Sequence, residues 1–297
     1  MTCCGKYIRI LTFALLASGF HIMAFSQSDT LVQPGKNSTI ENDSTYTIHS
    51  LYSSIGSGSN MIFLGSTISR DKPFYSAAVT YGYKNSFYAS ASASHIIGVN
   101  PYAAFYSLSL NYSHVFNSWF DISSSIAGYK APSSLQETLF SDFAFINLTT
   151  GFDWKLIYTK LSFGELISDD RHGYIQVRNS RYFETPEFFS GKSKISFDPN
   201  INILFGDLLK IETTTGLTKL GSSPPFRHFK KIPNSTIKSY SYKFGLMDFE
   251  FSLPVTFSYD KFSIEAEPSY ILPSFSNSDY PAPEGFTFFI NAFFRIL

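Results

Sequence analysis

Apolar and polar residues alternate along three segments at the C-terminal end of the chain. In the first segment Phe251, Leu253 and Val255 occupy one parity, while Ser252 and Thr256 occupy the other. The same alternation continues through 261–272 and 285–296. A period of two predicts β-strands with one apolar face and one polar face. Such strands fit a sandwich that buries its apolar faces, or a membrane barrel that turns them to lipid.

The alternation recurs upstream, and we predict strands from residue 60 to the end. They are expected near 60–69, 74–83, 87–97, 104–116, 119–129, 142–153, 155–167, 194–205, 208–219, 246–259, 261–272 and 285–296. Most contain about 10–13 residues, more than the five or six usual in soluble sheets and enough for a tilted membrane crossing. The positions that alternate with the apolar residues are mostly Ser, Thr, Asn and charged residues. The inward positions of a soluble core would also include Leu, Val and Ile. The predicted fold class is therefore all-β, an antiparallel transmembrane β-barrel of about 12 strands.

The connections between these predicted strands alternate in length. Short turns are expected at 84–86, 117–118, 154, 206–207 and 260–261, and longer loops at 70–73, 98–103, 130–141, 168–193, 220–245 and 273–284. In bacterial barrels the short turns face the periplasm and the long loops face outward. Trp119 and Trp154 lie beside short turns, where an interfacial belt of aromatic residues is expected. We therefore predict that both termini are periplasmic.

The N-terminal region predicts export from the cytoplasm. Residues 1–26 combine basic Lys6 and Arg9 with a short apolar stretch, and they end in the small-residue pattern Ala24-Phe25-Ser26. These are the features of a cleavable signal peptide, and the alternative is an uncleaved membrane anchor. Residues 27–59 are rich in Ser, Thr, Asn, Asp and Gly, which predicts a flexible periplasmic segment, with a short helix or plug-like element near 47–55. The barrel is expected to occupy 60–297.

Composition narrows the class of protein further. Charged residues make up 15% of the chain, well below the roughly 25% of ordinary globular proteins, while aromatic residues reach 18%. Mean hydropathy is nevertheless near zero, at −0.01, as expected when apolar residues alternate with polar ones. The formal net charge is zero and no basic stripe is present, which argues against nucleic-acid binding.

Together these features resemble the bacterial outer-membrane β-barrel class. The resemblance rests on the signal peptide, the ladder of amphipathic strands and the aromatic-rich last strand, 286–297. The chain departs from the usual pattern in ending on Leu297, with Phe294 the nearest aromatic residue. The resemblance implies a porin-like protein of a Gram-negative outer membrane. Its expected partners are outer-membrane lipid, lipopolysaccharide and the outer-membrane barrel assembly machinery, and no cofactor is expected.

One set of charged residues falls on the predicted inward faces. The set comprises Asp121, Asp153, Lys160, Asp198, Lys210, Glu212, Glu250, Glu265, Glu267 and Arg295. They either line a narrow channel for a small polar solute or form a salt-bridged filling that closes the barrel. Counting down the last two strands further predicts a contact between Glu265 and Arg295.

A second set of candidate binding residues falls in the predicted loop 168–193. It comprises Arg171, Arg178, Arg181, Tyr174 and Tyr182, which could contact lipopolysaccharide phosphates or a partner protein. The alternative is an ordinary solvated loop.

Catalytic and metal sites receive little support. His95 with Ser94 and Asn100, or His172 with Asp169 and Asp170, could imitate barrel hydrolases, but a triad is defined by geometry, not by adjacency in sequence. The acidic residues lack the ligand spacing of a calcium loop. We predict a non-enzymatic barrel, either a narrow channel or a structural and binding barrel. The alternatives are an outer-membrane lipid hydrolase and a surface component that docks a partner through its long loops.

Overall fold

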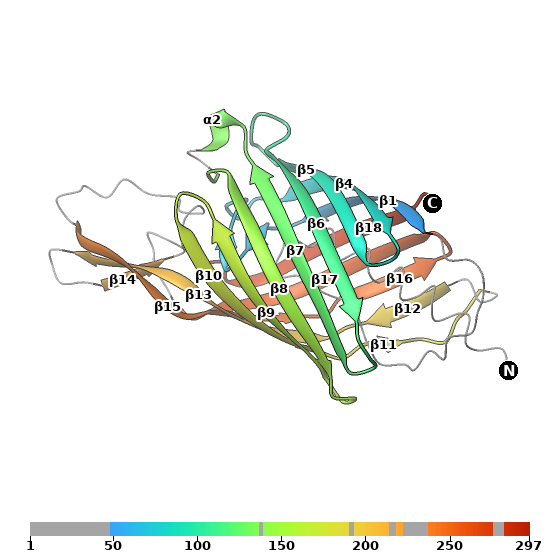
Figure 1. Ribbon diagram of the computed structural model, residues 1–297. Helices are drawn as coiled ribbons and strands as arrows, with labels where there is room; N and C mark the ends of the chain where they lie inside the picture. The colour runs from blue at the N-terminus through green and yellow to red at the C-terminus, as the bar shows by residue number, and fades with distance from the viewer. Residues whose placement is uncertain (1–47, 137–138, 190–192, 214–217, 222–236, 276–281) are drawn as a thin grey trace.

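The wall of the molecule is a closed antiparallel barrel of 12 strands (Figure 1). The computed structural model describes residues 48–297 apart from 137–138, 190–192, 214–217, 222–236 and 276–281, so the predicted signal peptide lies outside the described residues. Strand β1 (His49–Gly58) pairs with β4 (Phe74–Tyr83) on one side and with β18 (Gly285–Arg295) on the other, which closes the ring. The predicted fold class is confirmed.

Each of the other wall strands pairs with the wall strands before and after it. They are β5 (Phe87–Ile96), β6 (Phe105–Val115), β7 (Phe120–Lys130), β8 (Phe143–Asp153), β9 (Tyr158–Ile167), β10 (Arg171–Ser180), β12 (Ser193–Phe197) continued by β13 (Asn200–Thr213), β15 (Ile237–Ser252) continued by β16 (Val255–Tyr259), and β17 (Phe262–Pro273). Pro199 and Pro254 lie at the two interruptions, because proline cannot donate a ladder hydrogen bond. Their carbonyl groups still accept bonds from Arg181 and Asp198. Two short strands, β11 (Phe183–Glu184) and β14 (Thr218–Gly221), pair with β12 and β13.

The two ends of the barrel differ in their connections. Turns at 84–86, 116–119, 154–157 and 260–261 share one end with the start of β1 and the end of β18, and we call this the short-turn end. Lys84 and Asn85 both have positive φ, as a two-residue hairpin turn requires. The opposite, long-loop end carries most of the longer connections. Trp119 and Trp154 are exposed at the short-turn end.

The exposed and buried faces of the wall strands are the ones that the apolar–polar alternation predicted. Along β18, Phe286, Ile290 and Phe294 are exposed, while Thr287 and Asn291 are buried. Strand β4 alternates without exception between buried and exposed positions. Exposed apolar side chains therefore cover the outside of the barrel, and polar side chains fill much of the inside.

The segment after β1 turns back into the barrel as a hairpin. Its strands are β2 (Ile62–Phe63) and β3 (Ser66–Thr67), and we call residues 59–73 the inserted hairpin. The Phe63 ring is fully buried at 5.4–5.6 Å from the rings of Tyr129, Phe143 and Phe145 on β7 and β8. The predicted strand at 60–69 is therefore wrong, because these residues pack against the lumen and not into the wall.

The inserted hairpin is the centre of an apolar core inside the barrel. Wall residues from β4, β7, β8, β13, β15 and β18 contribute to the same cluster. A short helix, α2 (Ser133–Gln136), adds Leu135 from the loop between β7 and β8, and Phe140 in that loop packs on Phe105 with ring centroids 5.3 Å apart. No helix in the described part of the chain is long and apolar enough to cross a membrane.

The sequence analysis missed two wall strands. Strand β1 lies in the predicted flexible segment 27–59, and β10 lies in the predicted loop 168–193. The predicted turn at 206–207 is also wrong, because Gly206 lies within β13. A Cβ there would come within 2.5 Å of Tyr174 Cδ1 and 2.6 Å of Met247 Sδ, so this glycine allows close packing inside the strand.

Beyond Gly206 the strand pair β13–β15 leaves the barrel wall. Strand β10 no longer pairs with β13 there, and β14 takes its place at residues 209–212. The resulting three-stranded projecting sheet extends away from the barrel at the long-loop end (Figure 1). It replaces most of the separate wall strand that was predicted at 208–219.

Candidate functional site

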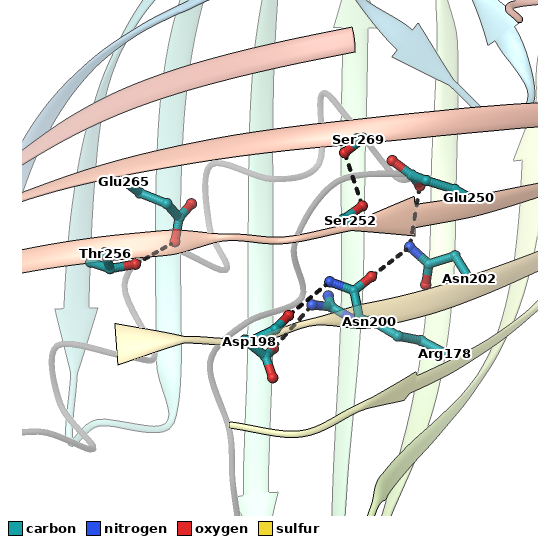
Figure 2. A network of polar contacts seen from close by, with 9 residues as sticks. All are labelled: Arg178, Asp198, Asn200, Asn202, Glu250, Ser252, Thr256, Glu265 and Ser269. Atoms are coloured by element: carbon teal, nitrogen blue, oxygen red, sulfur yellow. Dashed lines mark hydrogen bonds and ion pairs between the residues drawn. The ribbon is translucent and has the colours of Figure 1, made fainter. Parts of the chain in front are cut away.

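A network of buried polar side chains lines the lumen between β9 and β17, and Figure 2 shows nine of its members. At its centre Arg178 Nη2 donates to Asp198 Oδ2 at 3.2 Å, and the two side chains are only 5% and 6% exposed. Lys160 on β9 is the cross-strand partner of Arg178. The Asn200 side chain donates to the Asp198 carbonyl at 3.1 Å. This cluster is thus held by one ion pair and supported from neighbouring strands.

The network continues onto β15 through paired amides and carboxylates. Asn202 Nδ2 donates to Glu250 Oε2 at 3.2 Å, and Glu250 is fully buried. The hydroxyl groups of Ser252 and Ser269 lie 2.9 Å apart, which joins β15 to β17 (Figure 2). Alternation places all these side chains on the inner face, because the opposite parity of each strand faces outward.

Strand β17 contributes two further buried carboxylates. Glu265 accepts a hydrogen bond from Thr256 at 3.1 Å, and Glu267 lies one inward position further along. The register pairs Glu265 with Asn291, whereas the backbone of Arg295 bonds to Lys261. The predicted register of the last two strands was therefore wrong, and Glu265 does not stand beside Arg295. Arg295 is half-buried near the rim and donates to the Leu297 carbonyl at 2.8 Å.

Two predicted lumen residues near the short turns have clear local roles. Asp121 is buried and accepts a hydrogen bond from the Tyr158 hydroxyl at 2.6 Å. Gly151, its cross-strand partner, leaves room for that bond because a Cβ would overlap both groups. Asp153 instead accepts the Lys155 backbone N–H at 2.7 Å and so holds the turn 154–157.

Lys210 and Glu212 do not line the lumen. They form an ion pair with Nζ and Oε1 2.8 Å apart on the projecting sheet, with side chains 34% and 39% exposed. The prediction failed because inward parity was extended past the point at which β13 leaves the wall.

The second predicted set does not form a single loop. Tyr174 and Arg178 lie on the inner face of β10, with Tyr174 packed into the apolar core. Arg171 lies on the outer face, 3.6 Å from Glu165. Arg181 donates to the Lys155 carbonyl in the connection at the short-turn end, opposite to the expected outer side. Tyr182 donates to Glu184 at 3.1 Å, and burial raises the pKa of its phenol.

Sequence reasoning singled out charges and therefore missed the buried amides. Asn202 and Asn291 share the inward parity with the charged residues, so the alternation itself could have identified them. The inserted hairpin also carried a signal, since Met61, Ile62, Phe63 and Leu64 form an apolar run without alternation, followed by Gly65.

Histidine and metal chemistry remain weakly supported by the geometry. His172 Nδ1 lies 3.7 Å from Asp207 Oδ2, a residue that the sequence analysis did not pair with it. His95 Nδ1 donates to the Tyr102 carbonyl at 2.7 Å, with the two rings stacked. Within the described ranges, no three His, Cys, Asp or Glu side chains are grouped closely enough to hold a metal ion.

The closed ring, the apolar outer surface and the polar inner face together define the architecture. It is that of the outer-membrane β-barrel class. No protein-family model and no curated protein matches the chain.

Similarity to solved structures is confined to fold. The NanC porin aligns with a TM-score of 0.44 at 8% identity, over 82% of this chain and 98% of the porin. LpxR from Salmonella typhimurium aligns with a TM-score of 0.45 at 6% identity, over 82% of this chain and 99% of LpxR. Omp33 from Acinetobacter baumannii aligns with a TM-score of 0.36 at 11% identity, over 84% of this chain and 98% of Omp33. These similarities are too distant to bear on what the lumen does.

Proposed function

We propose that this protein is a non-enzymatic outer-membrane barrel, a narrow channel for small polar solutes that the inserted hairpin holds closed. The exposed apolar belt suits a lipid environment. In this proposal the short-turn end faces the periplasm, the long-loop end faces outward among lipopolysaccharide, and the barrel assembly machinery inserts the chain.

The observation that carries the proposal is the burial of the inserted hairpin across the lumen. Phe63 packs against aromatic rings on β7 and β8. At the tip, a Cβ on Gly65 would lie 2.9 Å from Asp248 Oδ2 and 3.1 Å from Met247 Cε, both on β15. The hairpin therefore touches two separate parts of the wall, and in this proposal it blocks the space between them.

The polar wall supports a channel over a purely structural filling. Replacing a buried ion pair by well-packed apolar residues is often neutral or stabilising. Stability alone therefore does not require the Arg178–Asp198 pair or the buried carboxylates Glu250, Glu265 and Glu267. A wall that must pass a polar solute does require groups of this kind.

Conductance in planar bilayers tests the proposal. The wild-type protein should be largely silent, and Gly65→Val should open it. Gly65 has a φ of 69°, and a larger side chain there meets Asp248 and Met247. Gly98→Val is the matched control, because Gly98 also has positive φ (76°) but only the end of Lys72 lies near, at 3.8 Å. Steady wild-type conductance, or a silent variant with residues 61–68 replaced by Gly and Ser, would contradict the proposal.

A further inference from the structure

A row of inward positions crosses five neighbouring strands of the wall. Ser76 on β4, Gly56 on β1, Asn291 on β18, Glu265 on β17 and Thr256 on β16 are successive cross-strand partners. We call these residues the polar row. Side chains directly opposite each other on neighbouring strands have Cβ atoms about 5 Å apart. The members of the polar row therefore lie at one level of the lumen, and adjacent members are close neighbours.

Two members of the polar row have unmet hydrogen-bonding capacity. Neither amide atom of Asn291 nor the Ser76 hydroxyl has a hydrogen-bond partner among the described residues, and Asn291 is 0% exposed. A Cβ on Gly56 would lie 3.0 Å from Ser76 Oγ and 3.2 Å from Asn291 Oδ1. Two oxygen acceptors thus converge over the Gly56 backbone. Because buried polar groups are normally bonded, this convergence indicates an occupant that the protein does not itself supply.

The buried charge inside the barrel favours a positively charged occupant. Among the described residues, six carboxylates but only two Lys or Arg side chains are buried. The carboxylates are Asp121, Asp198, Asp248, Glu250, Glu265 and Glu267, and the basic residues are Lys160 and Arg178. Glu265 belongs to the polar row itself, immediately beside Asn291.

An aromatic ring completes the surroundings. The same hypothetical Gly56 Cβ would lie 3.0 Å from Phe289 Cζ, and the Phe289 ring stacks on Phe74 with centroids 5.9 Å apart. Aromatic faces attract ammonium and guanidinium groups through the ring quadrupole. Carboxylate, amide and hydroxyl oxygens beside a ring match an N–H-bearing organic cation better than a divalent metal.

We propose that the polar row binds a small organic ammonium ion, held by Glu265, Asn291 and Ser76 against the Phe289 ring. This rests on the proposed function, since displacement of the inserted hairpin gives a solute access to the row. The chemical class of solute is thereby a primary ammonium ion and not an anion or a neutral sugar.

Calorimetric titration of the full-length protein in detergent with butylammonium chloride tests the proposal, with 1-butanol as the neutral probe. Butylammonium should bind saturably to the wild-type protein or to Gly65→Val, and 1-butanol should not bind. Glu265→Gln and Asn291→Leu should each weaken binding about tenfold or more. Glu165→Gln removes a carboxylate from the outer face and should leave binding unchanged. Heat-modifiability on gels identifies folded variants.

Three results would overturn the proposal. They are equal binding of 1-butanol, unchanged butylammonium binding in the folded variants of the row, and no saturable binding in either wild type or Gly65→Val. The last result would mean that water alone satisfies Asn291 and Ser76. Binding is measured without conductance, so butylammonium binding to a protein that never conducts would reject the channel and retain the site.

Discussion

Replacing Arg178 by methionine should destabilise the barrel strongly, because it leaves a buried carboxylate without its ion-pair partner. Arg178 and Asp198 are almost fully buried, with Nη2 and Oδ2 3.2 Å apart. Removing one member of such a pair typically costs about 3–5 kcal/mol. Lys160 lies beside Arg178 in the register and offsets part of the lost charge, so we expect a cost near the lower limit, about 3 kcal/mol.

The matched control lies on the same strand. Arg171 is on the outer face of β10, paired with Glu165 at 3.6 Å, and the two side chains are 75% and 43% exposed. An exposed pair of this kind contributes about 0–1 kcal/mol, so Arg171→Met should have a small effect. Both variants are compared by equilibrium unfolding in urea, with the folded fraction measured by heat-modifiability and tryptophan fluorescence.

A double-mutant cycle makes the prediction specific. Asp198→Asn removes the negative charge, so Arg178→Met combined with Asp198→Asn should be more stable than the sum of the single changes predicts. Equal losses for Arg178→Met and Arg171→Met, or simple additivity in the cycle, would refute the view that this pair is shielded from water.

Three further predictions concern the packing, the lipid-facing surface and the orientation. Gly151→Ala should lower the free energy of unfolding by about 1–3 kcal/mol, because the added Cβ overlaps the Tyr158 hydroxyl and the Asp121 carboxylate, which are hydrogen-bonded to each other. Gly128→Ala is the control: nothing lies within 4 Å of its Cβ, so the free energy of unfolding should change by less than about 0.5 kcal/mol. Urea unfolding distinguishes the two variants. Ile290→Arg on the exposed face should cost about 2–4 kcal/mol near the bilayer midplane, and an equally stable folded variant would place this face away from lipid. A cysteine at Tyr102 should react with an impermeant maleimide on intact cells and one at Asn85 should not, and the reverse labelling would invert the barrel.

The outward faces of most wall strands were predictable because their outward positions are mainly apolar. On β18 the parity of Phe286, Ile290 and Phe294 contains no polar residue, so its direction could be read directly. The inward parity of the same strand is mixed, since Phe289 and Asn291 both belong to it. An architecture that depends on one uniform face can therefore be recognised even when the other face follows no rule.

Strands β1 and β10 escaped recognition because their outward faces are weakly apolar. On β1 this face includes Ser53 and Ser57, and on β10 it includes Gly173 and Asn179. The predicted number of strands was nevertheless right. Two missed strands were balanced by the predicted strands at 60–69 and 208–219, of which the first is the inserted hairpin and the second lies largely on the projecting sheet.

The character of the lumen could not be predicted, since it depends on contacts between residues far apart in sequence. Glu250 and Glu265 are buried, and the tip of the inserted hairpin lies against Asp248, although these residues are far from the hairpin in sequence. The polar row has the same origin: Gly56 and Asn291 become neighbours only when β18 closes against β1. A glycine at an inward position of a wall strand says nothing by itself, but once the closing register is known it marks a place where other side chains can converge. Local alternation therefore predicts which way a side chain points, and closure of the ring determines what it meets there.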